Sequence, residues 1–382
     1  LWDARHEWGA EKCVIMLQKL SGFYLKVAQV FATKQDFLPK QYIQKLSFVF
    51  ENCDPMSPTE VLKTIQSELS RDVRNTLIHI EEAPIACATI AQVHRGIFES
   101  VGTVAMKIKR SDSERLMKLD MANMLLVSRI MDAANLHVPF DHTSVLLEYQ
   151  SQIPREFDFE RERVMMDLLE RSICSKFEHI KVPRSFPSAS SDSVITMTFM
   201  EGFSLSNFLS MRLSVGFEQA LILKFATSLL EVYAYQIFEL GIFQSDPHPG
   251  NLLIGTQGGL TILDFGQVKV LSSTTRIALA QLVIALARDS PDAGELLTLL
   301  GVKLDCANEK LETAVAYILF DTRMDLPMAK MNPFDTDLPP EVRALKISRI
   351  PREVFMLVRV VALLRGILSS LGLDIHSRRI WA

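Results

Sequence analysis

Three side chains in the second half of the chain have the types and spacing needed to handle magnesium and a phosphate group. Asp246 is followed five residues later by Asn251, and two short apolar runs then lead to Asp264. Mg²⁺ takes oxygen ligands, and phosphoryl transfer also needs a carboxylate near the acceptor hydroxyl. We therefore predict that Asn251 and Asp264 bind Mg²⁺ and that Asp246 is the catalytic base or orients the nucleophile. Asp-Pro and Pro-Gly-Asn are ordinary turn sequences when they occur alone, so the prediction depends on both fragments occurring together.

A lysine upstream supplies the cation that such a site needs. Lys107 lies in the strand-like run 103–109, and protein kinases place a lysine on their third strand to contact the α- and β-phosphates. The acidic segment 156–162 offers carboxylates to hold this lysine, because Asp158 and Glu162 would lie one turn apart on one face of a helix. The alternative interpretation of this segment is an exposed acidic helix start that the helix dipole stabilises.

The segment that would cover the phosphates differs from a glycine-rich loop. No Gly-x-Gly-x-x-Gly precedes Lys107, and the small residues Ala86, Cys87, Ala88 and Thr89 stand in its place. Small side chains still let the backbone approach phosphates, but alanine does not reach positive φ cheaply, so we expect a stiffer loop. The alternative interpretation is a strip of small residues that serves only for packing.

Periodicity along the chain indicates the elements that must position these residues. Residues 4–75 have helical spacing, and two strands joined by a hairpin turn are expected at 90–98 and 103–109. Helical spacing returns over 112–150, and residues 194–199 have the composition of a strand.

The rest of the chain is predicted to be helical, with a small hairpin in its middle. Glu201 and Gly202 form a natural hinge between two lobes. From Leu205 onward the only strand-like runs that the pattern indicates are 251–254 and 260–263.

The composition is that of a globular protein with a large core. Of the 382 residues, 48% are hydrophobic and 23% are charged, and the length accommodates a two-lobed enzyme. The net charge of −4 lacks the basic footprint of a nucleic-acid-binding protein. The five cysteines are scattered and have no Cys-x-x-Cys spacing, which favours a reducing compartment over a disulfide framework or a zinc site.

The distribution of apolar residues predicts no membrane-spanning helix, because no stretch is long and apolar enough to cross a bilayer. Residues 354–371 form the most apolar late segment, but they include Arg359 and Arg365 and are expected to form an amphipathic or buried helix. Because the sequence begins with Leu1 and not with Met, we expect a preceding segment, in which any transit peptide or anchor would lie.

Together these motifs resemble those of the UbiB/AarF-domain family of atypical kinases, and the resemblance extends over nearly the whole chain. The matching segments are the Lys-x-Gly-Gln-like helix at 26–29, the alanine-rich loop at 86–94, the Glu-x-Asp motif at 156–158, the catalytic loop at 246–251 and the Asp-Phe-Gly turn at 264–266. Glu162 falls where the family has the glutamate that pairs with the strand lysine. Arg359 and Arg365 resemble part of the family's C-terminal Arg…Gly helix.

Two positions depart from the family pattern. Ala28 stands where the family commonly has Gly, which gains about 1 kcal/mol of helix propensity but prevents the closest backbone approach. Gln244 stands where the family often has His, two residues before Asp246. That histidine is generally structural, so its replacement does not argue against activity.

The resemblance implies an α+β, protein-kinase-like two-lobed fold that is mostly helical, with a helical N-terminal extension covering the active site. The implied domains are the extension at 1–75, an N-lobe of strands plus a helical insert at 76–200, and a helical C-lobe at 201–382. Lys26 and Gln29, one helical turn apart, would point toward Glu156 and Asp158 and have a regulatory role.

The cofactors implied by the resemblance are ATP and Mg²⁺. The residues expected to contact the nucleotide are Ala86, Cys87, Ala88, Thr89, Lys107, Glu162 and Glu201. Lys107 and Asp246 are the expected catalytic residues, and Asn251 and Asp264 are the expected metal ligands.

The function that the resemblance implies is an ATPase that supports quinone or isoprenoid-lipid biosynthesis in a mitochondrion or plastid. Its implied partners are a quinone precursor or another lipid-like ligand, biosynthetic proteins and a membrane surface, and not nucleic acid. Because the extension would occupy the place where a protein substrate docks, ATP hydrolysis is favoured over phosphorylation of other proteins.

Two alternatives remain open at this stage. One is a conventional protein kinase, which the missing glycine-rich loop and the absence of Ala-Pro-Glu after Asp264 disfavour. The other is a non-enzymatic scaffold that uses bound nucleotide as a conformational switch. Release of γ-phosphate without a protein acceptor would distinguish an ATPase from both.

Overall fold

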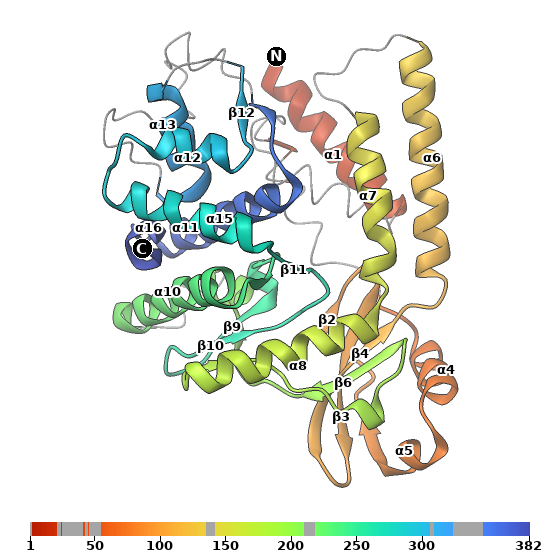
Figure 1. The fold of residues 1–382 in the computed structure, drawn as a ribbon. Coiled ribbons are helices and arrows are strands. Elements are labelled where there is room, and N and C mark those ends of the chain that lie inside the picture. The colour runs from red at the N-terminus through yellow and green to blue at the C-terminus, as the bar shows by residue number, and fades with distance from the viewer. Residues whose placement is uncertain are drawn as a thin grey trace. The chain divides into compact units, whose positions relative to one another are not determined.

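The computed structural model describes residues 2–20, 24, 41–42, 45, 55–134, 142–209, 218–305, 309–323 and 347–382. They form two compact units (Figure 1). Unit 1 comprises Leu1–Val164 and Arg184–Phe199, and unit 2 comprises Met165–Pro183 and Met200–Ala382. The mixture of helices with antiparallel sheets confirms the predicted α+β class. The three-part division expected at residues 75 and 200 stays a prediction.

Unit 1 is built on a five-stranded sheet in the order β1-β3-β4-β6, with β2 paired to β3. The strands are β1 (Leu77–Ile80), β2 (Ala86–Cys87), β3 (Ala91–Phe98), β4 (Gly102–Lys109) and β6 (Val194–Thr198). The predicted hairpin is confirmed, since β3 and β4 pair antiparallel from Ala91–Lys109 to Phe98–Gly102. Gly102 ends the turn at φ +80°, a conformation that glycine adopts without steric cost.

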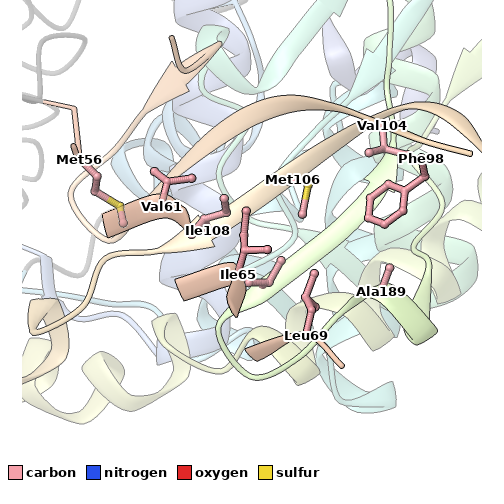
Figure 2. Packing of buried hydrophobic residues seen from close by; sticks show 10 residues of the cluster. Met56, Val61, Ile65, Leu69, Phe98, Val104, Met106, Ile108 and Ala189 are labelled. Atoms are coloured by element: carbon pink, nitrogen blue, oxygen red, sulfur yellow. The ribbon is translucent and has the colours of Figure 1, made fainter. Parts of the chain in front are cut away.

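Helix α4 (Pro58–Glu68) covers one face of this sheet. Ser57 starts the helix with a capping box, in which its hydroxyl and the Glu60 carboxylate bond to each other's backbone N–H groups. Val61 and Ile65, one turn apart, then pack into a buried cluster with Met106 and other side chains of the hairpin (Figure 2). Alternation along β4 puts Met106 in this core and its neighbour Lys107 on the opposite face.

Unit 1 has further helices. They are α1 (Trp2–Leu20), α5 (Arg71–Thr76), α6 (Ser113–Ala133), α7 (His142–Glu156) and the start of α8 (Phe159–Lys176). Helix α5 packs beside α4 and β1. Helices α6 and α7 lie side by side (Figure 1), with Met121 and Leu125 of α6 in one cluster with Ile153 of α7 and the adjoining Phe157. The predicted helicity of 112–150 is therefore confirmed where the structure describes it.

Unit 2 is mostly helical. Its helices are α10 (Gln219–Ala234) with its π-helical continuation η2 (Tyr235–Leu240), α11 (Ser273–Ala287), α12 (Ala293–Leu299), α13 (Glu309–Phe320), α15 (Arg352–Leu371) and α16 (Ser377–Trp381). They pack through a largely apolar interior.

Short strands connect the helices of unit 2. One sheet has the order β5 (Ile180–Lys181), β10 (Leu260–Ile262), β9 (Leu252–Ile254) and β7 (Phe203–Ser204). Two-stranded sheets join β8 (Ile242–Gln244) to β11 (Val268–Val270) and β12 (Lys303–Leu304) to β13 (Ile347–Arg349). The predicted strands at 251–254 and 260–263 are confirmed as β9 and β10. The β8–β11 pair was not predicted, because three-residue strands between helices leave no readable alternation.

The expectation that no segment is long and apolar enough to cross a membrane was wrong. Two helices of the described chain meet both criteria, Gln219–Leu240 and Arg352–Leu371. Of their most apolar windows, 56% and 50% of residues are buried inside the protein. Arg365 lies in the second helix and donates to the backbone carbonyls of Ile318 and Asp321. Because such contacts belong to a protein interior, we interpret both helices as core helices of unit 2.

A buried ionic network fixes the C-terminal helix to the end of α13. Asp321 is completely buried and accepts hydrogen bonds from Arg378, from the Ser377 hydroxyl at 3.2 Å and from His376 Nδ1 at 2.8 Å. The Arg378 guanidinium also lies over the ring of Tyr317, 5.0 Å from its centre. Since α16 has only five residues, tertiary contacts and not helix propensity hold it in place. They are this network and the packing of α16 on α10, where Trp381 Nε1 donates to the Leu230 carbonyl at 2.9 Å.

Removing the cation of this network should destabilise unit 2 more than removing a neighbouring surface charge. Arg378→Met leaves Asp321 buried beside fewer donors, so we expect the free energy of unfolding to fall by about 3–5 kcal/mol. Arg379→Met, at an exposed position of the same helix, is the control and should change it by less than about 0.5 kcal/mol. Urea titration followed by circular dichroism measures both, and equal effects would show that the network does not anchor α16.

Candidate active site

The predicted site residues that the structure describes fall into two groups, one in each unit. In unit 1, Lys107 on β4 meets Glu162 on α8, with Nζ and Oε1 2.5 Å apart. Only 17% of the Lys107 side chain and 6% of the Glu162 side chain are exposed. A largely desolvated pair is costly to break from either side. Glu162 therefore holds the lysine in a defined position, as predicted, while the nucleotide contact of both residues stays a prediction.

Asp158 has a structural task in addition to any predicted regulatory one. It precedes α8, and its Oδ1 accepts the backbone N–H of Arg161 at 2.9 Å, as an N-cap residue does. The interpretation of this segment as an acidic helix start thus holds for Asp158, whereas Glu162 points to the lysine. Glu156 is the last residue of α7, and α8 begins at Phe159. The Glu-x-Asp motif therefore spans the end of α7 and the two-residue turn that leads into α8.

A second lysine, which sequence reasoning missed, lies on the same face of β4. Lys109 donates from Nζ to the Phe157 carbonyl at 2.7 Å and lies over the Phe159 ring, 4.7 Å from its centre. Lys107 lies 5.4 Å from the centre of the same ring. Burial lowers the pKa of Lys109 below its ordinary value, against the opposing effect of carboxylates that include Asp158. The signal available in the sequence was the i, i+2 spacing of two lysines on a predicted strand.

The small-residue loop is a tight, backbone-bonded turn. Ala86 and Cys87 form β2, and the Ala88 N–H donates to the Ala91 carbonyl at 2.8 Å. Arg110 adds a bond from Nε to the Ala88 carbonyl at 3.1 Å. Residues 86–91 are all described and none has a positive φ, in agreement with the expectation that alanine avoids it. Thr89 lies within this turn, and its contact with nucleotide stays a prediction.

Two buried polar residues of β3, Gln92 and His94, form a hydrogen-bond network next to this loop. His94 Nδ1 contacts the Glu81 carbonyl at 2.8 Å, so Nδ1 carries the proton and Nε2 accepts from the Gln92 amide at 2.6 Å. The Gln92 oxygen in turn accepts the Met56 N–H at 2.8 Å. This fully paired network fixes β3 where it leaves the loop, and Cys87 Sγ lies 3.6 Å from the same oxygen.

In unit 2 one side chain, Gln244, links Asp246 to Asp264, and Asn251 joins the same network through the Asp246 carbonyl. The Gln244 amide nitrogen donates to the carbonyl of Asp246 at 2.7 Å and to the carbonyl of Asp264 at 3.4 Å. Its oxygen accepts from the hydroxyl of Tyr233. Burial, and to a smaller extent the Asp246 carboxylate, raises the pKa of Tyr233 well above its ordinary value, so this donor stays protonated. Gln244 thus has a structural role in this loop.

The two predicted metal ligands have suitable atoms. The Asn251 amide nitrogen donates to the Asp246 carbonyl at 3.4 Å, which turns its oxygen away from that bond. Asp264 has φ +59°, a strained conformation for a residue with a side chain, and its Oδ1 accepts the Gly266 N–H at 3.1 Å. An amide oxygen and a carboxylate fit Mg²⁺, which takes few protein ligands and otherwise keeps water and phosphate oxygens.

Other kinds of metal site find no support in the described part of the chain. No group of three or more His, Cys, Asp or Glu side chains is arranged there to hold an ion. His248 accepts the Gly250 N–H through Nδ1 at 3.1 Å, which is a structural role within the loop.

Arg359 on α15 completes the surroundings of Asp246. Its two terminal nitrogens donate to Asp246 Oδ1 at 2.8 Å and to the Gln267 side-chain oxygen at 2.9 Å. The sequence showed Arg359 only as part of a C-terminal motif and did not predict this partner. The available signal was an arginine in the middle of an apolar helix, because a charge there needs an opposite charge nearby.

Three further predicted site residues remain, of which the structure describes only Glu201. Glu201 is exposed beside Gly202, where a Cβ would come within 3.2 Å of the Ile254 carbonyl oxygen. Its contact with nucleotide stays a prediction. Lys26 and Gln29 lie outside the described residues, and so does Ala28. Their regulatory contact with Glu156 and Asp158 therefore stays a prediction as well.

Known sequences match this chain over most of its length. The ABC1 atypical kinase-like domain matches residues 48–295. AarF domain-containing protein kinase 1 of Xenopus laevis is 26% identical over 367 residues, which cover 92% of this chain and 68% of that protein. The chloroplastic protein ACTIVITY OF BC1 COMPLEX KINASE 7 of Arabidopsis thaliana is 26% identical over 264 residues, which cover 69% of this chain and 37% of its own length.

A solved structure shares the fold. Rv3197 of Mycobacterium tuberculosis, determined as a complex with erythromycin, aligns with a TM-score of 0.61 and 18% identity, covering 98% of this chain and 94% of that one. At that identity the similarity concerns the fold, which is protein-kinase-like. The matched domain, the catalytic-loop geometry and the fold agree, and the chain belongs to the ABC1 atypical kinase-like family, also called the UbiB/AarF family.

Proposed function

We propose that this protein binds Mg-ATP and acts as an atypical kinase or ATPase. The observation that carries the proposal is one hydrogen-bond network, in which Gln244 donates to the carbonyls of Asp246 and Asp264 and Asn251 donates to the same Asp246 carbonyl. Such a network holds catalytic groups in position before substrate binds, and phosphoryl transfer depends mainly on positioning and electrostatic stabilisation. Lys107, oriented by Glu162, would contact the phosphates.

Each residue then has a defined task. Asn251 and Asp264 would hold Mg²⁺, which neutralises charge on the phosphates when bound. Asp246 would orient the attacking hydroxyl or water and receive its proton. The turn at 86–89 would cover the phosphates with backbone, and Glu201 would contact the nucleotide near the hinge.

The wider role that we propose is support of quinone or isoprenoid-lipid biosynthesis in an organelle. Relatives named chloroplastic favour a plastid, and a mitochondrion is the other organelle implied by the family resemblance. The proposed ligands are a quinone precursor or another lipid-like molecule, together with biosynthetic proteins and a membrane surface. The prenyl-lipid profile of cells lacking this protein, before and after complementation, tests this role. An unchanged profile would contradict it.

Loss of the Asp264 charge should abolish stabilisation by Mg-ATP. Asn tolerates positive φ and can still accept the Gly266 N–H, so Asp264→Asn removes the charge and preserves the backbone. At a hundredfold excess over Kd the parent should gain about 2.7 kcal/mol, seen as a rise in melting temperature, and the variant should gain almost nothing. Asp112→Asn, at another aspartate with positive φ, is the control. A variant stabilised as strongly as the parent would refute the metal assignment.

Asp246 should affect turnover more than binding, because a base or orienting group acts mainly in the transition state. We expect Asp246→Asn to lower kcat by roughly 10²–10⁴-fold with little change in ATP affinity. Phosphate release and nucleotide titration measure the two quantities. An equal loss of both would assign Asp246 a structural role.

Arg359 should act through Asp246. Arg359→Gln removes a charge-assisted bond worth about 1.5–3 kcal/mol, so kcat should fall about ten- to hundredfold while KM for ATP changes little. Arg352→Gln, at the exposed start of the same helix, should leave both constants unchanged. A rise in KM with normal kcat would show that Arg359 does not position Asp246.

A further inference from the structure

Helix α6 has two apolar faces, and within the described part of the chain the inner one is buried while the outer one is exposed. Its inner face includes Met117, Met121 and Leu125, which are buried against α7 and its neighbours. The outer face carries large apolar side chains that are about half exposed or more: Leu116 48%, Leu119 50%, Leu126 57%, Val127 56% and Ile130 58%. Water-exposed apolar side chains this close together on one helix mark a contact surface.

The outer face has the spacing of a coiled coil. The seam consists of Leu116, Leu119, Asn123, Leu126, Ile130 and Ala133, which alternate by three and four residues. This alternation defines a and d positions of a heptad, with Leu116, Asn123 and Ile130 at a. The inner-face methionines then fall at b and f, on the opposite side of the helix.

Contacts of the inner face with α7 stabilise α6 as a helix. Besides the buried cluster, the Ser128 and Thr143 hydroxyls are 2.6 Å apart, and Thr143 also donates to Asp132 at 3.1 Å. A short seam is a poor coiled coil in an isolated peptide, because forming the helix costs most of the free energy gained. Here the fold has already formed the helix, so a short seam suffices.

We propose that α6 forms a parallel two-stranded coiled coil with α6 of a second copy of this chain. The position of Asn123 favours a second copy of the same helix as the partner. In a parallel, in-register pair this residue faces Asn123 of the partner subunit, and the two amides can satisfy each other. An antiparallel pair would place it beside Leu126 of the partner subunit, where its amide would have no polar partner.

Charges at the edges of the seam favour the same arrangement. Arg115 occupies a g position and Asp120 the following e position. A parallel pair places these opposite charges next to each other across the interface, on both sides of the two-fold axis. A lipid membrane is a less suitable occupant of this face than a second copy of the chain. The Asn123 amide in the centre of the face would lie in hydrocarbon without a hydrogen-bond partner, which costs free energy.

The test is the association state of the full chain. Sedimentation equilibrium should show a monomer–dimer equilibrium, and Leu126→Glu and Leu119→Glu should each weaken it by at least about a hundredfold in Kd. Both side chains are exposed, so circular dichroism should show unchanged folding. Leu62→Glu, the same change at a 46% exposed leucine of α4, is the control and should leave the dimer intact.

Asn123→Val tests the register. It should tighten association about tenfold or admit higher oligomers, because a polar residue at an a position lowers stability but fixes the oligomeric state. A parent that remains monomeric would overturn the proposal, and so would a dimer that Leu126→Glu or Asn123→Val leaves unchanged. Flotation with mixed phosphatidylcholine–phosphatidylserine vesicles provides the last arm. Seam-dependent vesicle binding without self-association would identify a membrane surface instead.

Discussion

The free-energy cost of taking a charge out of water governs the position of the key side chains in both units. Lys107 is largely buried against a glutamate of α8. Asp246 is matched by Arg359, and the fully buried Asp321 by Arg378. In the two more deeply buried pairs, Lys107–Glu162 and Arg378–Asp321, removing one partner leaves a buried charge that costs several kcal/mol. Each pair therefore joins two elements that are far apart in the chain. Two of the pairs lie at the candidate active site, and the third anchors the C-terminal helix α16.

Neutral polar groups then set the fine geometry of the catalytic loop. Gln244 satisfies the carbonyls of Asp246 and Asp264 with one amide nitrogen, and the protonated Tyr233 holds its oxygen. This network offsets the strain of Asp264 at positive φ. The contacts of Gln244 are all hydrogen bonds, so its role in this loop is structural.

Part of the site could be predicted because its signals are local. The order of Asp246, Asn251 and Asp264 follows from turn chemistry and short apolar runs in one stretch of chain. Lys107 was assigned from its strand, and Glu162 as its partner from helix spacing together with the family resemblance. Lys109 and Arg359 were missed because their partners, the Phe157 carbonyl and Asp246, are brought to them by folding alone.

The sequence by itself determined the α+β class, the β3–β4 hairpin, the strands β9 and β10 and the family, because periodicity and motif order depend on neighbours along the chain. Only the tertiary structure decided that Arg359 pairs with Asp246, that Gln244 joins the two halves of the loop, and that the apolar helix α15 is a core helix. Those outcomes depend on which charges and apolar surfaces meet after folding. Sequence spacing does not encode such long-range contacts, whereas desolvation and packing select them.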